Sequence, residues 1–342
     1  MTGKNILQSS CPGNALTLTV IEHPPPHPHL PNICSGQIEL FYVYIPGVWN
    51  QVKILSNRLL YWFGKNIGIW VIRLVVWVIA TGYFFFFPRR VKASLELYRT
   101  AFKNKNPLFY LHCVWRQFHD LAQSHCDEIA FSFGMPIHHT SEGRDNILKA
   151  ANAGRGGIII MSHMGSWGIA ARIFRQDNFK VMLIMGERQA KLIDQQQRGE
   201  LEGAGLKILV SKTDDHDSLF TGIEALKFIR EGGFLCIAGD IGWTDPRSRL
   251  TATFFGRSIY LPAGPHTLAL VSGAPVFTLF AYRLGRGNYQ VVILPPRIVK
   301  AASRDARSDA IRESAQIYAS NLEEAVQQYP FEWHVFESIF VK

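Results

Sequence analysis

The chain has 342 residues, of which 47% are hydrophobic and 18% are charged, so it can bury a large core and is not an intrinsically disordered protein. Its formal net charge of +9 suits an anionic partner, such as a membrane surface or an acidic carrier protein, but the basic residues form no Lys/Arg block of the kind that grips nucleic acid. The five cysteines are odd in number, widely spaced and form no CxxC pair, so we expect free thiols and neither a disulfide framework nor a zinc site.

Residues 1–60 are predicted to form a poorly ordered leader. They include the stretch "HPPPHPHLP", and prolines at this density prevent a helix and remove the hydrogen-bond donors that a sheet needs. No charged segment precedes an apolar core here, so the leader does not resemble a secretory signal.

Residues 61–92 are predicted to anchor the chain in a membrane. Positions 67–87 form a 21-residue apolar run with one charge, Arg73, and roughly 20 apolar residues span a bilayer as a helix. Arg73 sits nearer one end, where its side chain can snorkel, and Trp70 and Trp77 suit a membrane interface. Basic residues after the run favour a cytoplasmic location for the rest of the chain. A spanning helix, a re-entrant helix and a core helix of a soluble protein all fit this pattern.

The remainder, residues 93–342, is predicted to form one α/β domain with a largely parallel central sheet flanked by helices. Residues 93–131 are mostly helical, and after them apolar runs alternate with helical segments, which is typical of such a sheet. Strands are expected at 157–162, 180–185, 206–210, 233–239, 275–283 and 289–294, and helices at 166–174, 189–202, 217–230, 263–272 and from Ser303 onward.

Two polar residues come directly after predicted strands. His163 follows "GIIIMS" and Asp240 follows "GFLCIAG", and ligands of open α/β sheets bind beyond the carboxyl ends of the strands. An imidazole that titrates near neutrality suits the removal of a proton from a hydroxyl. A structural histidine and a helix-capping or solvated aspartate are the plainer alternatives. Arg247 and Arg249 lie in the polar loop that follows, where they either hold an anionic group or are solvated.

The sequence gives no indication of a metal site or an organic cofactor. It has neither a GxxxxGK[ST] phosphate loop nor a GxGxxG that follows a strand. The histidine pairs His119/His125 and His138/His139 lack the spacing of metal ligands, so we expect them on loops or helix surfaces.

Several longer motifs occur in order along the chain: "FFPRRVKASLELYRTAF", "SHMGSWGIAA", "GDIGWTDPRSR…FFG", "LPAGPHTLALVSGAPVFTLFAYR", "ILPPR" and "NLEEAVQQYPFEWHVF". Together they resemble the bacterial lipid A late acyltransferases, the lauroyl/myristoyl group within the lysophospholipid acyltransferase superfamily. The resemblance covers most of residues 70–335, and the order of the motifs makes it more specific than any one of them.

The resemblance implies an enzyme of the bacterial inner membrane with its catalytic domain on the cytoplasmic side. It would move a fatty acyl chain from a thioester, on acyl carrier protein or CoA, to a hydroxyl of a lipid or glycolipid such as a lipid A precursor, without a cofactor. The family's His-x4-acid motif makes His163 the general base. The resemblance also places Arg188 and Arg198 near the lipid headgroup or the carrier, and Ser166, Trp167, Arg247 and Arg249 complete the expected substrate contacts.

The sequence departs from the family pattern at position 168, where the motif acid is replaced by Gly168. That acid orients the imidazole, and its loss costs on the order of 10²–10⁴ in rate if nothing replaces it. Asp240 is one candidate to supply the carboxylate, and Ser166 is a candidate to fix the tautomer. The alternative is a degenerate homologue that binds lipid or a partner enzyme without turnover. A hydrolase is a third reading, but no GxSxG elbow is present.

Overall fold

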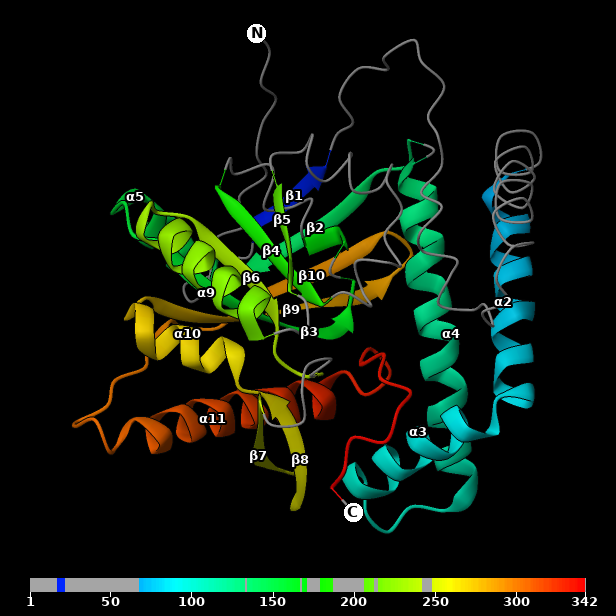
Figure 1. Cartoon of the computed structure of the whole chain (residues 1–342). Coiled ribbons are helices and arrows are strands. Elements are labelled where there is room, and N and C mark those ends of the chain that lie inside the picture. The colour runs from blue at the N-terminus through cyan, green and yellow to red at the C-terminus, as the bar shows by residue number, and fades with distance from the viewer. Residues whose placement is uncertain are drawn as a thin grey trace, which may run out of the picture.

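The computed structural model describes residues 17–21, 68–132, 134–166, 168–170, 179–186, 206–211, 215–241 and 248–341. These residues form a mixed α/β fold with a mostly parallel central sheet between layers of helices, which confirms the predicted fold class (Figure 1). In chain order the elements are β1 (Thr17–Ile21), α2 (Ile69–Phe86), α3 (Pro88–Ala101), α4 (Pro107–Ser132), β2 (Ile137–Glu142), α5 (Arg144–Asn152), β3 (Gly157–Gly165), β4 (Val181–Gly186), β5 (Leu206–Ser211), α9 (Asp215–Arg230), β6 (Phe234–Ala238), β7 (Arg249–Phe254), β8 (Arg257–Pro262), α10 (Gly264–Ser272), β9 (Pro275–Gly285), β10 (Asn288–Ile293), β11 (Arg297–Ile298) and α11 (Arg307–Gln328).

The central sheet has nine strands within the described part of the chain, in the order β1-β2-β10-β9-β3-β6-β4-β5, with β11 beside β9. Every neighbouring pair from β9 to β5 is parallel, whereas β1–β2 and β10–β9 are antiparallel. The parallel strands read as continuous apolar runs because helices cover both of their faces. β3, the strand that leads to His163, lies at the centre, between β9 and β6.

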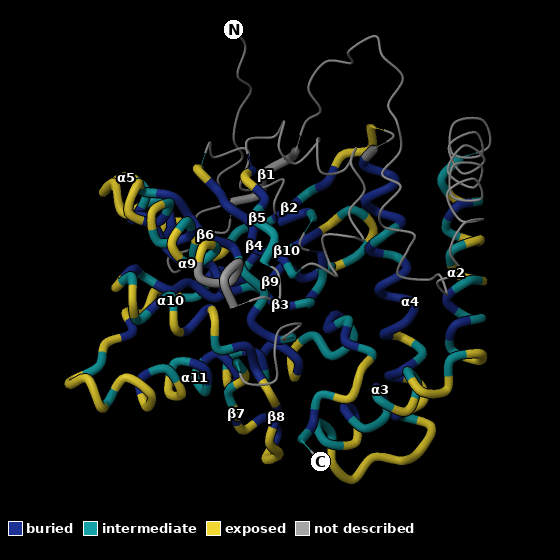
Figure 2. The backbone as a smooth tube through the Cα atoms, viewed as in Figure 1, coloured by how far each residue is buried: buried dark blue, intermediate teal, exposed yellow. Residues whose placement is uncertain are grey.

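The core divides into two layers, one on each face of the sheet. Successive side chains of a strand point to opposite faces, so Ile158 and Ile160 join one layer and Ile159 joins the other. Helices α9, α10 and α11 cover the first face, and α5 together with residues 168–170 covers the second. The strands at the centre of the sheet are accordingly largely buried (Figure 2).

The hairpin of β7 and β8 differs from the polar loop that the sequence predicts after Asp240. A side chain of α11 stabilises this hairpin by hydrogen-bonding to the backbone of β7, as a neighbouring strand would. The side-chain amide of Gln316 accepts a hydrogen bond from Thr253 N at 2.8 Å and donates one to Thr253 O at 3.0 Å. Phe255 and Gly256 form the turn with φ of 51° and 77°, the two positive values that favour tight hairpins.

Three further segments differ from the prediction. β1 forms a strand inside the leader, because it shares a ladder with β2, and the rest of residues 1–60 lies outside the described residues. His138 and His139 lie on β2 and not on a loop, and His119 and His125 lie on largely buried faces of α4. α11 begins at Arg307, because the Ser303 hydroxyl accepts a hydrogen bond from Ala306 N in a turn that precedes the helix.

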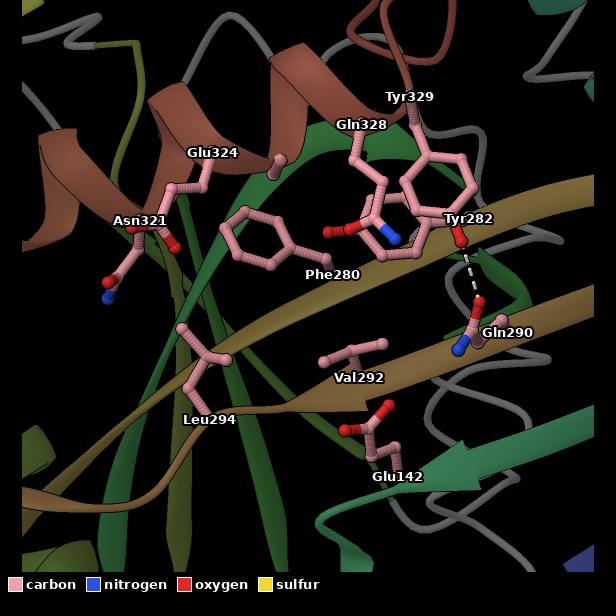
Figure 3. A pocket seen from close by; sticks show the side chains of 11 residues that line it. Glu142, Phe280, Tyr282, Gln290, Val292, Leu294, Asn321, Glu324, Gln328 and Tyr329 are labelled. Atoms are coloured by element: carbon pink, nitrogen blue, oxygen red, sulfur yellow. Dashed lines mark hydrogen bonds between the residues drawn. The ribbon is translucent and has the colours of Figure 1, made fainter. Parts of the chain in front are cut away.

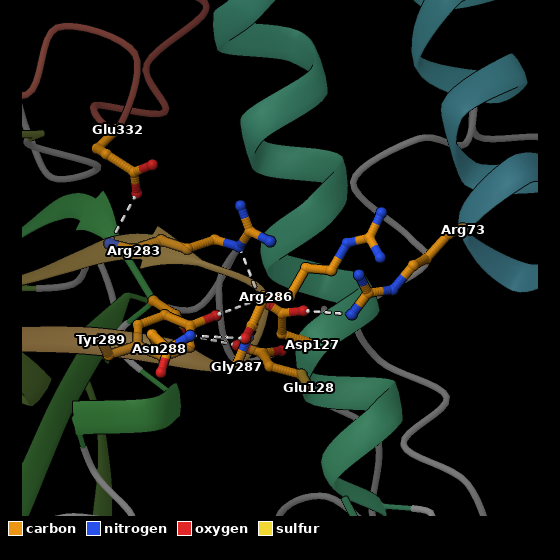
Figure 4. A network of polar contacts seen from close by, with 10 residues as sticks. Arg73, Asp127, Glu128, Arg283, Arg286, Gly287, Asn288, Tyr289 and Glu332 are labelled. Carbon is orange, nitrogen blue, oxygen red and sulfur yellow. Dashed lines mark hydrogen bonds and ion pairs between the residues drawn. The ribbon is translucent and has the colours of Figure 1, made fainter. Parts of the chain in front are cut away.

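The apolar run forms helix α2, and among the described residues it is the one helix long and apolar enough to cross a membrane. Arg73 does not snorkel as predicted. Its guanidinium lies 3.1 Å from Asp127 Oδ1 of α4, and Arg283 Nε of β9 lies 2.7 Å from Asp127 Oδ2 (Figure 4). The Asp127 carboxylate is almost completely removed from water, and these two guanidinium groups compensate its buried charge.

β3 does not end at Ser162 as predicted but continues to Gly165. The pairing of β3 with β9 becomes irregular between Met161 and Gly165, so His163 lies on a distorted part of the strand. Gly165 has a φ of +65°, and a Cβ there would lie 1.6 Å from Ala281 O of β9. Only glycine therefore allows β3 to approach β9 this closely just after His163.

We expect Gly165→Ala to destabilise the protein by about 2 kcal/mol or more, because the substitution adds a strained φ to a backbone clash. Thermal unfolding of the detergent-solubilised chain measures the effect. Gly222→Ala in α9 is the matched control, since no atom lies within 4 Å of its added Cβ, and it should stabilise the helix by about 0.5–1 kcal/mol. Equal melting temperatures for Gly165→Ala and wild type would contradict this account of the strand.

Candidate active site

His163 and Asp240 meet at the carboxyl edge of the sheet. Asp240 Oδ1 lies 2.8 Å from His163 Nδ1, and Asp240 Oδ2 accepts a hydrogen bond from the backbone N–H of His163 at 2.6 Å. The Asp240 side chain is fully buried, whereas the His163 side chain is 27% exposed. The structure thus brings together the two residues that follow β3's apolar run and β6, and it excludes the solvated-loop alternative for Asp240.

A third donor completes the hydrogen bonding of Asp240. The indole Nε1 of Trp333 donates to Asp240 Oδ2 at 2.8 Å, and the Trp333 side chain is buried. The segment that carries Trp333 follows α11 and pairs with β3: Gly165 N donates to Glu332 O, and His334 N donates to His163 O at 2.8 Å. The C-terminal segment therefore fixes both partners of the pair from one side.

The close approach of β6 to its neighbours depends on a second glycine. Gly239 precedes Asp240, and a Cβ at this position would lie 2.3 Å from Ile160 Cγ2 and 2.8 Å from Tyr318 Cζ. Tyr318 of α11 donates its hydroxyl hydrogen to Met161 O at 2.9 Å, so it also holds β3 at this level. The residues around the pair leave no room for a larger side chain at position 239.

The pKa values of the pair move in opposite directions. Burial lowers the pKa of His163, but the charge of Asp240 and its hydrogen bond to the ring raise it, and the result lies above the ordinary value. Burial raises the pKa of Asp240, but the His163 ring, the Trp333 indole and the His163 N–H lower it to a value below the ordinary one. Asp240 is therefore an anion at neutral pH and stabilises a proton on His163.

The pair also determines which ring nitrogen is free. With Nδ1 facing a carboxylate, the neutral ring of His163 carries its hydrogen on Nδ1. Nε2 has no hydrogen-bond partner within the described part of the chain, so it can accept a proton from a bound molecule. Nearby, His334 stays neutral, because burial and then the charges of His125 and His163 lower its pKa to about 3.

Ser166 does not contact the His163 ring. Its hydroxyl donates to Glu128 Oε1 of α4 and accepts a hydrogen bond from Ile169 N at 3.3 Å. Ser166 thus caps the short helical stretch at 168–170, in which Gly168 lies, and links it to α4.

The other predicted site residues are not brought to the pair. Arg249 is exposed on β7, with its guanidinium carbon 6.0 Å from the centroid of the Tyr260 ring, and none of its contacts among the described residues is with His163 or Asp240. The remaining predicted substrate contacts lie outside the described residues: Trp167, Arg188, Arg198 and Arg247.

Two residues of the site were missed from the sequence. Trp333 belongs to the motif "YPFEWHVF", but nothing in its local pattern indicates a bond to Asp240, 93 positions away. Glu128 gave no signal beyond the helical pattern of 93–131. A buried acid within an otherwise apolar helix face is the feature that would have singled it out.

A cavity of about 240 Å³ lies between β9, β10 and α11 and does not include the pair (Figure 3). Its walls contain the stacked rings of Tyr282 and Tyr329, whose centroids are 3.9 Å apart, and the carboxylates of Glu142 and Glu324. Neither His163 nor Asp240 lines this cavity.

Comparison with known proteins agrees with the geometry. The family model for bacterial lipid A biosynthesis acyltransferases matches residues 112–342, which include β3, β6 and the C-terminal segment. The chain belongs to this family. It is also similar to two proteins named phosphatidylinositol mannoside acyltransferase: that of Mycolicibacterium smegmatis, with 24% identity over 194 residues (56% of this chain, 59% of the relative), and that of Mycobacterium tuberculosis, with 22% identity over 196 residues (57% and 58%). The matches thus span somewhat under three fifths of these relatives.

Within this acyltransferase family member, we expect Asp240→Asn to lower the pKa of His163, because the substitution removes the negative charge that favours the protonated ring. The pH dependence of deuterium exchange at the His163 Cε1 carbon, followed by mass spectrometry, reports this pKa without any need for substrate. Asp120→Asn, which removes another largely buried acid that does not contact His163, is the control and should leave the exchange profile unchanged. A profile unaltered by Asp240→Asn would show that the carboxylate does not govern the ring.

Proposed function

We propose that the protein is a membrane-bound O-acyltransferase that moves a fatty acyl chain from a thioester to a hydroxyl of a lipid or glycolipid, with His163 as general base. The observation that carries the proposal is the His163–Asp240 pair, in which Nδ1 is held and Nε2 has no hydrogen-bond partner among the described residues. Family membership and the similarity to phosphatidylinositol mannoside acyltransferases support acyl transfer as the reaction class.

The proposed step begins with neutral His163, whose Nδ1–H donates to Asp240. Nε2 takes the proton from the acceptor hydroxyl as its oxygen attacks the carbonyl carbon of the thioester. The C–S bond then breaks, and the proton on Nε2 passes to the leaving thiolate, which gives an ester and a free thiol. Asp240 stabilises the imidazolium between these two transfers, because it stays anionic.

Asp240 also accounts for the glycine in the His-x4-acid motif. The carboxylate that orients the imidazole comes from the end of β6, so a residue at position 168 need not supply it. Gly168 is the one observation that favours a second candidate, a degenerate homologue that binds lipid without turnover. The occupied Nδ1 of His163 argues against that candidate.

The substrates are proposed by class. The donor is an acyl chain on acyl carrier protein or CoA, and the net charge of +9 suits the acidic carrier. The acceptor is a lipid A precursor or another glycolipid, with phosphatidylinositol mannosides as an alternative taken from the names of the relatives. The proposed location is the cytoplasmic face of the bacterial inner membrane. The proposed substrate contacts remain Ser166, Trp167, Arg188, Arg198, Arg247 and Arg249.

Acyl transfer in isolated membranes tests the proposal, with labelled acyl carrier protein and acyl-CoA as donors and a panel of lipid acceptors. His163→Gln should reduce transfer by about 10²–10⁴, the usual contribution of a general base. His112→Gln, which alters an exposed histidine of α4, is the matched control and should retain wild-type activity. In wild type, kcat/KM should fall as the pH drops through an apparent pKa above about 6.5, because the base must be neutral.

Two results would overturn the proposal. Transfer by His163→Gln at the wild-type rate would show that His163 is not the general base. The pH profile of this variant would then identify the group that is. A wild-type protein that binds the lipid acceptors but transfers no acyl group from either donor would establish the degenerate homologue instead.

A further inference from the structure

Helix α2 presents an apolar surface that nothing in the described part of the chain covers. Figure 2 shows exposed positions along the side of α2 that faces away from α4. Monomeric soluble proteins rarely expose a continuous apolar patch of this kind. The exposed side chains are Trp70 (61%), Leu74 (54%), Val75 (41%), Trp77 (43%), Val78 (56%), Phe85 (67%) and Phe86 (81%).

The opposite face of α2 packs on α4 along its whole length. Near the start of α2, Ile72 forms a buried cluster with Cys126 and Ile129 of α4. Near its end, the ring centroid of Phe84 lies 5.3 Å from that of Trp115. α2 therefore lies against the domain and does not extend away from it (Figure 1).

Polar contacts fix this arrangement and tie it to the sheet. Thr81 Oγ1 lies 3.2 Å from His119 Nε2, and Arg73 pairs with Asp127. Asp127 also accepts hydrogen bonds from Arg283 Nε at 2.7 Å and from Gly287 N at 3.2 Å, next to β10 (Figure 4). Separation of α2 from α4 would leave Arg73 without its buried partner, which is strongly unfavourable.

α4 cannot accompany α2 into a bilayer. Over the length that α2 covers, α4 carries Arg116, Asp120, Asp127 and Glu128, and charged groups at the centre of a bilayer are costly. A crossing α2 would have to leave α4 or bring these charges with it. Both are costly, so the arrangement that keeps the contacts of α2 is one in which a bilayer meets only its outer face.

The charges near this outer face indicate the partner. No Asp or Glu occurs between residues 68 and 95. Arg89, Arg90 and Lys92 follow α2 directly. An apolar face with a basic border fits a bilayer that contains anionic lipid, with tryptophans at the interface.

We infer that α2 lies along the surface of one leaflet, with its outer face in the acyl-chain boundary, and that it does not span the membrane. This arrangement differs from the spanning helix, the re-entrant helix and the soluble core helix that the sequence leaves open. The inferred orientation of α2 is argued from the contacts and the flanking charges of α2, and it does not depend on whether the protein catalyses acyl transfer.

One consequence rests on the proposed function. The side of α4 that faces away from α2 borders the active site, since Glu128 binds Ser166 and Gln117 donates to Trp333 O at 2.6 Å. One helix layer, about 8–10 Å between axes, then separates the membrane surface from the region of His163. A lipid acceptor in the same leaflet then lies one helix layer away from the base.

Spin labels at single cysteines test the inference in the full-length chain with its five native cysteines replaced by alanine, reconstituted in vesicles of phosphatidylethanolamine and phosphatidylglycerol. Leu74→Cys, Val78→Cys and Phe85→Cys carry the label, and its depth is measured from collisions with oxygen and with a water-soluble nickel complex. Ile223→Cys on α9, an equally exposed apolar position on a helix of the other layer, is the matched control and should report water.

A helix along the surface places the three labels at the same shallow depth. A spanning helix instead separates positions 74 and 85 by about 16 Å along the membrane normal, because a helix rises 1.5 Å per residue. Such a gradient of depth would overturn the inference. Labels shielded from both collision partners would also overturn it, by showing that another segment of the chain or a protein partner covers α2. Neither result bears on acyl transfer, so failure of the docking and failure of the proposed function remain distinct.

Discussion

The carboxylate of Asp240 is the interaction on which the arrangement of the site depends. It accepts hydrogen bonds from the backbone and the ring of His163 and from the indole of Trp333, and so joins β3, β6 and the C-terminal segment at one buried point. A buried charge with three donors is stable only if all three segments are in place. The position of the C-terminal segment and the orientation of the imidazole are thus coupled, because both depend on hydrogen bonds to the same carboxylate.

The sequence predicted the elements that carry this site better than the contacts that complete it. β3, β4 and β6 were predictable because strands buried on both faces are continuous apolar runs, and the meeting of His163 with Asp240 followed from their strand ends. The bond from Trp333 was not predictable, because it joins positions far apart along the chain and has no local periodicity. The β7–β8 hairpin was missed because its stability comes from Gln316 on α11 and not from its own pattern.

Helix α4 links the two halves of the proposed activity. One side of it holds α2 through Asp127 and Arg73, and another holds the site through Glu128 and Ser166. The sequence indicated an apolar helix and a polar site at the carboxyl edge of the sheet as separate features. Their relation appears only once α4 is packed between them, because a helical pattern alone does not say which buried acids it presents to which neighbour.

The most direct test of the central claim compares acyl transfer by wild type, Asp240→Asn and Gly168→Glu in the same membranes. If Asp240 is the carboxylate that orients His163, Asp240→Asn loses about 10²–10⁴ in kcat and Gly168→Glu gains nothing over wild type. A large gain by Gly168→Glu, or wild-type transfer by Asp240→Asn, would contradict the account. Either result would mean that Asp240 does not replace the acid that is absent from position 168.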